Sequence, residues 1–382
     1  MTDGVDLSDH LNLNPSGEAT RQGKIALLLA GGGFPGWMYE IGCLSALDEF
    51  FDDGFTVNDF DIYVGTSAGA GVAALIANQI KPIEIFEAIR ENKDSPFNFK
   101  SNNIYSFGYQ ETWQLFKKLV RSMLPMMGYL WRNRKWFSII DLAHMFEEYL
   151  PSGIFTLRNF DDYLGGFLSQ PGYTNDFRKL KRELYVPAID VDLGRYDVFG
   201  EGEFADVPIS KAVTASSAVP IVFQPVHIKG RDYIDGGVGR VAYMDIAINH
   251  GASLVFVINP IVHIVNDRTK VCLPTLYGYC GGLKEKGMSY IFDQGNRIST
   301  GTRVYLSLKR YQAEHPDKDF LLIQPDPSDA LMFLYNVINL AARLEILNYG
   351  YVSTVNVLRS QFASYEKSFA KHGVKVTLKR FR

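Results

Sequence analysis

A short apolar segment ending in Gly65-Thr66-Ser67-Ala68-Gly69 restricts the fold more than any other part of the chain. Residues 61–64 before it predict a buried strand, and residues 68–77 after it predict a packed helix. Small residues around Ser67 allow a tight strained turn, which exposes the hydroxyl and directs the positive N-terminus of the helix at it. The segment therefore predicts a nucleophilic serine, although Gly and Ser also occur in ordinary turns between a strand and a helix.

A glycine-rich loop precedes this turn. Residues 25–30 are a continuous apolar run, which predicts a strand covered on both faces, and residues 31–36 read Gly-Gly-Gly-Phe-Pro-Gly. Residues 37–50 then carry apolar side chains at helical spacing. Strands that alternate with helices predict a parallel sheet. Because loops at the C-terminal ends of parallel strands share one edge, we expect residues 31–36 to meet the Ser67 turn.

A third loop, Asp235-Gly236-Gly237, follows a predicted hairpin formed by residues 226–228 and 232–234. Acyl transfer needs a nucleophile, a group that takes its proton, and donors for the tetrahedral oxyanion. Ser67 is the predicted nucleophile and Asp235 the candidate base. The amides of Gly31 to Gly33 are the predicted oxyanion donors, because glycines let successive N–H groups approach a small anion. This chemistry requires neither a metal nor a cofactor.

With these residues the chain resembles the patatin-like lipid acyl hydrolases, a family that uses a Ser-Asp dyad without histidine. Four motifs occur in the family's order within residues 24–260: the glycine loop, the Ser67 turn, Ala215-Ser216-Ser217-Ala218-Val219-Pro220, and Asp235-Gly236-Gly237. The resemblance implies an α/β three-layer sandwich with a mainly parallel central sheet, helices on both faces, and a lipid ester as substrate. Its implied site comprises the catalytic Ser67 and Asp235, the oxyanion-hole residues Gly31, Gly32 and Gly33, and the supporting Gly36, Gly65, Gly69, Gly236 and Gly237.

The sequence departs from the family at Pro35, where the family usually has Arg or Lys before the last glycine of the first loop. Proline has no N–H and no charge, so it can neither bind the oxyanion nor pair with a substrate phosphate. A neutral ester is correspondingly easier to accommodate. The head group, acyl position and chain length are not fixed by the sequence.

The predicted domain organisation is a flexible polar arm over residues 1–22 and one hydrolase domain over 23–382. Within that domain, residues 94–165 are a helical insertion rich in aromatic side chains, and residues 266–382 are a mainly helical extension. Two interpretations of the insertion stay open. Its aromatics fill their own core, or they form a lid whose interspersed cations meet anionic lipid head groups.

Composition excludes some functions and sets expectations for location. A net charge of -3 does not favour nucleic-acid binding. Cys43, Cys272 and Cys280 are expected to be buried thiols in a reducing compartment rather than a disulfide framework. The N-terminus lacks a secretory signal and no apolar run is long enough to span a membrane, so we expect a cytoplasmic protein, with peripheral contact with lipid aggregates as a further expectation. The oligomeric state is not indicated.

Other functions remain as alternatives. The same fold can serve a neutral acylglycerol lipase, a thioesterase or a non-catalytic lipid-binding scaffold. The spacing of Gly31, Gly33 and Gly36 also fits a dinucleotide-binding loop, but the second predicted strand lacks the acidic residue that would hold the ribose. A Ser-His-Asp triad would need a histidine near the acid. The histidines considered for it are His227, His250, His263, His315 and His372.

Overall fold

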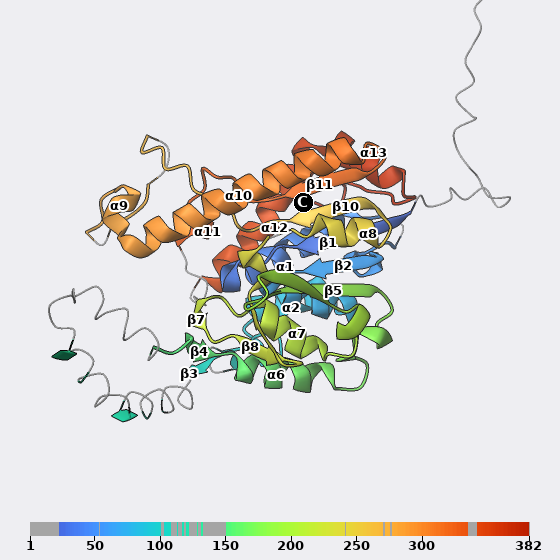
Figure 1. The fold of residues 1–382 in the computed structure, drawn as a ribbon. Helices are drawn as coiled ribbons and strands as arrows, with labels where there is room; N and C mark the ends of the chain where they lie inside the picture. The colour runs from blue at the N-terminus through green and yellow to red at the C-terminus, as the bar shows by residue number, and fades with distance from the viewer. Residues whose placement is uncertain are drawn as a thin grey trace, which may run out of the picture.

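The central element is a sheet with helices on both faces (Figure 1). It belongs to a computed structural model, which describes residues 23–52, 54–100, 103–107, 150–240, 242–269, 272–275, 277–334 and 342–381, and single positions between 113 and 132. In this part of the chain the strand order is β11-β10-β1-β2-β5-β9-β8, with β6 paired to β5.

The parallel part of the sheet contains the strands predicted from apolar runs. β1 (Lys24–Leu29) lies between β10 (Ala252–Ile258) and β2 (Ile62–Gly65), and both neighbours run parallel to it. β11 (Asp319–Ile323) and β5 (Glu183–Asp190) extend it on either side, also in parallel. Nearly every side chain of β1, β2 and β10 is buried, as expected for strands covered on both faces.

An antiparallel part completes the sheet beyond β5. β6 (Arg195–Phe199) and β9 (Arg231–Ile234) both pair with β5, and β8 (Val226–Ile228) pairs with β9 at the edge. β8 and β9 form the predicted hairpin. The mainly parallel three-layer fold is thus confirmed, with an antiparallel hairpin that carries the third loop of the predicted site.

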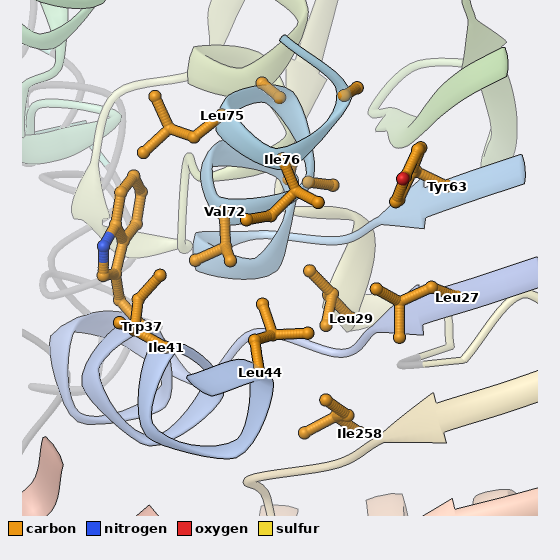
Figure 2. Close-up of a cluster of buried hydrophobic side chains, with 14 of the residues drawn as sticks. Leu27, Leu29, Trp37, Ile41, Leu44, Tyr63, Val72, Leu75, Ile76 and Ile258 are labelled. Carbon is orange, nitrogen blue, oxygen red and sulfur yellow. The ribbon is translucent and has the colours of Figure 1, made fainter. Parts of the chain in front are cut away.

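One helical layer lies over the face of the sheet shown in Figure 2. It contains α1 (Gly33–Phe50), α2 (Ala68–Ala77), α3 (Pro82–Arg90) and α12 (Arg343–Ser360). Trp37, Ile41 and Leu44 of α1 and Val72 and Ile76 of α2 belong to one buried cluster with side chains of β1, β2 and β10. This packing anchors the two helices whose N-termini lie next to the glycine loop and Ser67.

The opposite face is covered by α8 (Met244–Asn249) and the C-terminal half of α10 (Met288–Glu314). Three further helices complete the C-terminal region: α9 (Leu283–Lys286), α11 (Leu331–Leu334) and α13 (Phe362–Ala370). α11 ends at Leu334 and α12 starts at Arg343, and residues 335–341 between them lie outside the described part.

The insertion between α3 and β5 contains strands as well as helix. β3 (Ser106–Phe107) pairs antiparallel with β4 (Gly153–Thr156), and β4 pairs with β7 (Ile221–Phe223). α6 (Arg158–Leu168) follows and packs on α7 (Ile209–Ser216). Most of residues 101–149, on which the choice between a core and a lid depends, lie outside the described residues.

The cysteines depart from expectation. Cys43 is a buried free thiol, as predicted. Cys272 and Cys280 form a disulfide, with Cα atoms 4.9 Å apart, which contradicts the prediction of separate thiols. The bond closes a loop in which the Thr275 amide donates to the Tyr279 carbonyl, and this turn brings the two cysteines together.

None of the helices in the described ranges is both long enough and apolar enough to cross a bilayer.

Candidate active site

Ser67 lies at the junction of β2 and α2 in a strained conformation. Its φ of 55° and ψ of -130° place it in a region that residues with a side chain rarely adopt. The next residue, Ala68, begins α2, so the Ser67 side chain lies at the positive end of that helix. The strained turn that the sequence predicts is therefore present.

Asp235 follows β9 and meets Ser67 across the sheet edge. The Ser67 hydroxyl donates a hydrogen bond of 2.6 Å to Asp235 Oδ2, and both side chains are buried. Asp235 Oδ1 accepts a 2.6 Å hydrogen bond from the Gly237 amide, which fixes the carboxylate plane. Burial raises the pKa of Asp235 to about 6, although its hydrogen bonds from Ser67 and Gly237 act in the opposite direction. The two predicted catalytic residues are thus in direct contact.

The glycine loop passes directly beside Ser67. Gly31, Gly32 and Gly33 all have positive φ, at 79°, 114° and 66°, a conformation that favours glycine at each position. A Cβ on Gly31 would lie 2.4 Å from the carbonyl oxygen of Thr66 and 2.9 Å from the Ser67 Cβ. The chain can approach the nucleophile this closely only because these side chains are absent.

The amides predicted as oxyanion donors are not equivalent. The Gly31 amide donates to Glu40 Oε1 at 2.8 Å, so it is occupied. Within the described part of the chain, the amides of Gly32 and Gly33 at the start of α1, and of Ala68 at the start of α2, have no acceptor. Helix N-termini with unpaired amides attract anions. Two such termini therefore flank Ser67, and Gly31 contributes to the shape of the loop instead.

The supporting glycines are explained by close backbone contacts. A Cβ at most of these positions would overlap the backbone of a neighbouring segment, and at Gly237 it would meet only the Asp235 carboxylate. The overlapping contacts would be Gly36 with Gly31 O at 2.2 Å, Gly65 with Ala70 Cα at 2.5 Å, Gly69 with Leu29 O at 2.4 Å, and Gly236 with Pro187 O at 2.4 Å.

Ser216 connects the Ser67 turn to β5. It is fully buried at the end of α7, accepts a 3.0 Å hydrogen bond from the Ser67 amide and donates one of 2.7 Å to the Pro187 carbonyl. The carbonyl of Ala218, two residues after Ser216, accepts a hydrogen bond from the Asp235 amide. The Ala215–Pro220 motif thus contacts both members of the candidate dyad.

Glu40 is a buried acid in the apolar helix α1. Burial raises its pKa well above the usual range, and its Oε2 has no hydrogen-bond partner within the described part of the structure. A carboxyl group in this environment favours the neutral form. Its one hydrogen bond, to the Gly31 amide, holds the glycine loop against α1.

We predict that Glu40→Ala lowers the free energy of unfolding by about 2–3 kcal/mol, because the Gly31 amide is left buried and unpaired. Glu40→Gln keeps the acceptor and the shape, so its expected cost is below about 1 kcal/mol. Urea unfolding of the two variants measures the difference. Equal losses would mean that the hydrogen bond to Gly31 does not hold the loop.

Four of the five histidines considered for a triad have other partners. His227 Nδ1 lies 2.9 Å from Asp232, and His250 bonds to Tyr185 and Glu201. His315 stacks on Tyr311, and His372 Nδ1 lies 3.4 Å from the Ser253 hydroxyl. The partners of the Asp235 carboxylate are Ser67 and Gly237. The geometry favours a direct Ser-Asp pair over a triad.

Sequence reasoning missed Glu40 and gave Ser216 no role. A single acid among the apolar residues of 37–47 was a usable signal for a buried, hydrogen-bonded carboxyl. For Ser216 there was no such signal, because the sequence does not distinguish it from Ser217 beside it. The Ser217 hydroxyl has no partner in the described structure. Among the described residues, no group of three His, Cys, Asp or Glu side chains could hold a metal.

The chain is similar to several known proteins. The probable lipid hydrolase 463L of Invertebrate iridescent virus 6 is 23% identical over 224 residues, which are 59% of this chain and 63% of that protein. VipD from Legionella pneumophila has a TM-score of 0.38 at 15% identity, covering 94% of this chain and 72% of VipD. The type III effector ExoU of Pseudomonas aeruginosa has a TM-score of 0.36 at 17% identity, covering 90% of this chain and 54% of ExoU.

A family model described as patatin-like phospholipase matches residues 27–248, more than half of the chain. The matched range starts within β1 and ends within α8, so it includes the glycine loop, the Ser67 turn, Ser216 and Asp235. The chain belongs to the patatin-like phospholipase family.

Proposed function

We propose that this protein hydrolyses a carboxylic ester bond of a lipid, with Ser67 as nucleophile and Asp235 as base. The observation that carries the proposal is the 2.6 Å hydrogen bond between Ser67 Oγ and Asp235 Oδ2 beside two helix N-termini with unpaired amides. Family membership and the lipid-hydrolase name of the viral relative support the substrate class.

The proposed reaction has two halves. Asp235 accepts the Ser67 proton as Oγ attacks the ester carbonyl, and the amides of Gly32, Gly33 and Ala68 stabilise the oxyanion. Collapse of the intermediate expels the alcohol, which takes the proton from Asp235. Water then attacks the acyl-serine, passes a proton to Asp235 and releases the fatty acid, and the proton returns to Ser67. Every proton taken up is given back, so the enzyme is regenerated.

A small apolar cavity lies beside the first turns of α1 and α2. It is lined by Trp37, Leu75, Phe99 and Phe160, among others. Trp37 packs against the first turns of α2, where a Cβ on Gly71 would meet its ring at 2.1 Å. The volume of the cavity, about 20 Å³, is too small for an acyl chain unless these side chains move.

A neutral lipid ester is the second candidate substrate, and Pro35 favours it. Pro35 is buried in the first turn of α1, where the family has a cation. Incubation with phospholipids, lysophospholipids, acylglycerols and acyl-CoA, with released fatty acid read by mass spectrometry, separates the candidates. Release from none of these substrates would contradict the proposed hydrolase.

The raised pKa of Asp235 predicts an acid limb in the pH profile. The base acts only as a carboxylate, so kcat/KM should be constant well above pH 6 and fall about tenfold per pH unit below it. The measurement is hydrolysis of a short soluble ester between about pH 4 and pH 8. A midpoint near the ordinary aspartate value of about 4 would show that burial does not set the pKa of the base.

A further inference from the structure

The 27-residue helix α10 leaves an apolar face uncovered. Its buried residues, Arg297, Val304 and Tyr311, follow each other at a spacing of seven and face the protein. Further apolar side chains form a broad row that extends from the flank of the helix, about 100° from the buried residues, to the opposite side. This row, here called the α10 stripe, consists of Met288, Ile291, Phe292, Ile298, Tyr305 and Leu306, with exposed fractions from 48% to 88%.

The charges around the α10 stripe are mostly positive. Residues 284–314 contain three acids and six Lys or Arg, five of which lie outside the buried row that contains Arg297, whereas the whole chain has a net charge of -3. Asp293 is bonded to Arg297 at 2.7 Å, and Glu314 lies 3.8 Å from Arg310. No acid occurs between Asp293 and Glu314. An apolar stripe flanked by cations fits an anionic lipid surface.

The α10 stripe is tied to the candidate active site. Arg303 donates hydrogen bonds to the carbonyls of Val238 (3.3 Å) and Gly239 (2.9 Å), in the turn that follows Asp235. Val238 is itself 48% exposed. In Figure 1, α10 runs from the sheet toward α9 at the left of the view, on the same side as β4 and β7. Arg303 therefore links α10 to the turn that follows Asp235.

The loop closed by the disulfide adds two exposed aromatic side chains near α9, which precedes α10. Tyr277 is 85% and Tyr279 is 54% exposed, between Cys272 and Cys280. Lys286 Nζ donates a 2.8 Å hydrogen bond to the Pro274 carbonyl, which ties this loop to α9. Tyrosine suits the boundary between lipid and water, because its ring is apolar and its hydroxyl polar.

We propose that the α10 stripe, with Tyr277 and Tyr279, docks this protein on an anionic lipid surface and presents the candidate site to lipids in it. The purpose of this docking rests on the proposed function, whereas vesicle binding is measured independently of hydrolysis. A second copy fits the stripe less well. Lys284 and Lys286 lie at one end and Lys309 and Arg310 at the other, so two stripes would bring like charges together in either direction.

The test compares vesicle binding by the unmodified protein with that of a Phe292→Asp/Leu306→Asp variant. Flotation is measured with vesicles of phosphatidylcholine alone and of phosphatidylcholine mixed with phosphatidylglycerol. The unmodified protein should bind the anionic vesicles more strongly, and increasingly so at low salt. The variant should bind them at least about tenfold more weakly, with unchanged turnover of a short soluble ester.

Val352→Asp is the matched control. Val352 is 54% exposed on α12, which packs on α1 in the other helical layer, so this variant should bind vesicles normally. Equal vesicle binding by the stripe variant and the unmodified protein would overturn the proposal. The proposal would also be overturned if the unmodified protein did not bind anionic vesicles but self-associated, and the stripe variant did not self-associate. Binding without hydrolysis of any ester would contradict the proposed function and leave this inference standing.

Discussion

Replacing Ser67 by alanine, or Asp235 by asparagine, is expected to reduce kcat for ester hydrolysis by at least about 10³-fold. The first change removes the nucleophile, and the second removes the acceptor of its proton. Because the two groups share one hydrogen bond, the double variant should be little worse than either single variant. Turnover of a soluble ester and of the preferred lipid in the panel measures the loss.

Asp232→Asn serves as the control for Asp235→Asn. Asp232 lies on the same hairpin but is half exposed and bonded to His227, so its replacement should leave kcat within about twofold. Replacing His227 or His250 should likewise leave most of the turnover. The dyad would be contradicted if either dyad variant kept near-normal activity with an unchanged circular dichroism spectrum, or if one histidine cost as much as Ser67.

Ser216→Ala is expected to lower the free energy of unfolding by about 2–5 kcal/mol, because it leaves the Ser67 amide and the Pro187 carbonyl buried and unpaired. The strained turn at Ser67 also loses the group that holds it. We therefore expect kcat for a soluble ester to fall by about 10-fold or more even at temperatures where the variant is fully folded. Urea unfolding and steady-state kinetics measure the two effects.

The neighbouring Ser217 gives a control of identical chemistry. Its hydroxyl has no partner in the described structure, so Ser217→Ala should change stability by less than about 0.5 kcal/mol and leave kcat unchanged. Similar effects of both alanine variants would show that the hydrogen bonds of Ser216 do not support the turn.

The parallel core could be predicted because local sequence determines it. The apolar runs before Gly31 and before Ser67 are too short for helices and too apolar for exposed strands, so they predict buried strands. The same reasoning located the hairpin before Asp235. The rule that loops of a parallel sheet gather at one edge predicted that the glycine loop meets the Ser67 turn. It did not give the contact with Asp235, because β9 runs antiparallel to β5.

Features that depend on distant contacts could not be predicted. The pairing of Cys272 with Cys280 depends on a turn that brings their Cα atoms together, which cysteine number and spacing do not reveal. The loss of Gly31 as a free donor depends on Glu40, nine residues further along the chain. The role of Ser216 requires the relative positions of α7, β5 and the Ser67 turn.

The nucleophile and the base are carried by parts of the sheet with unequal local stability. Ser67 follows β2, which is paired on both sides within the parallel core. Asp235 follows β9, which pairs with β5 at Ile234 and Tyr233 and by one further bond from the Val191 amide to the Asp232 carbonyl. The other partner of β9 is the edge strand β8. Local opening requires less free energy where fewer contacts are broken. Partial unfolding of this hairpin would therefore separate Asp235 from Ser67 while the strands around Ser67 stay paired, so that catalysis is lost before the fold.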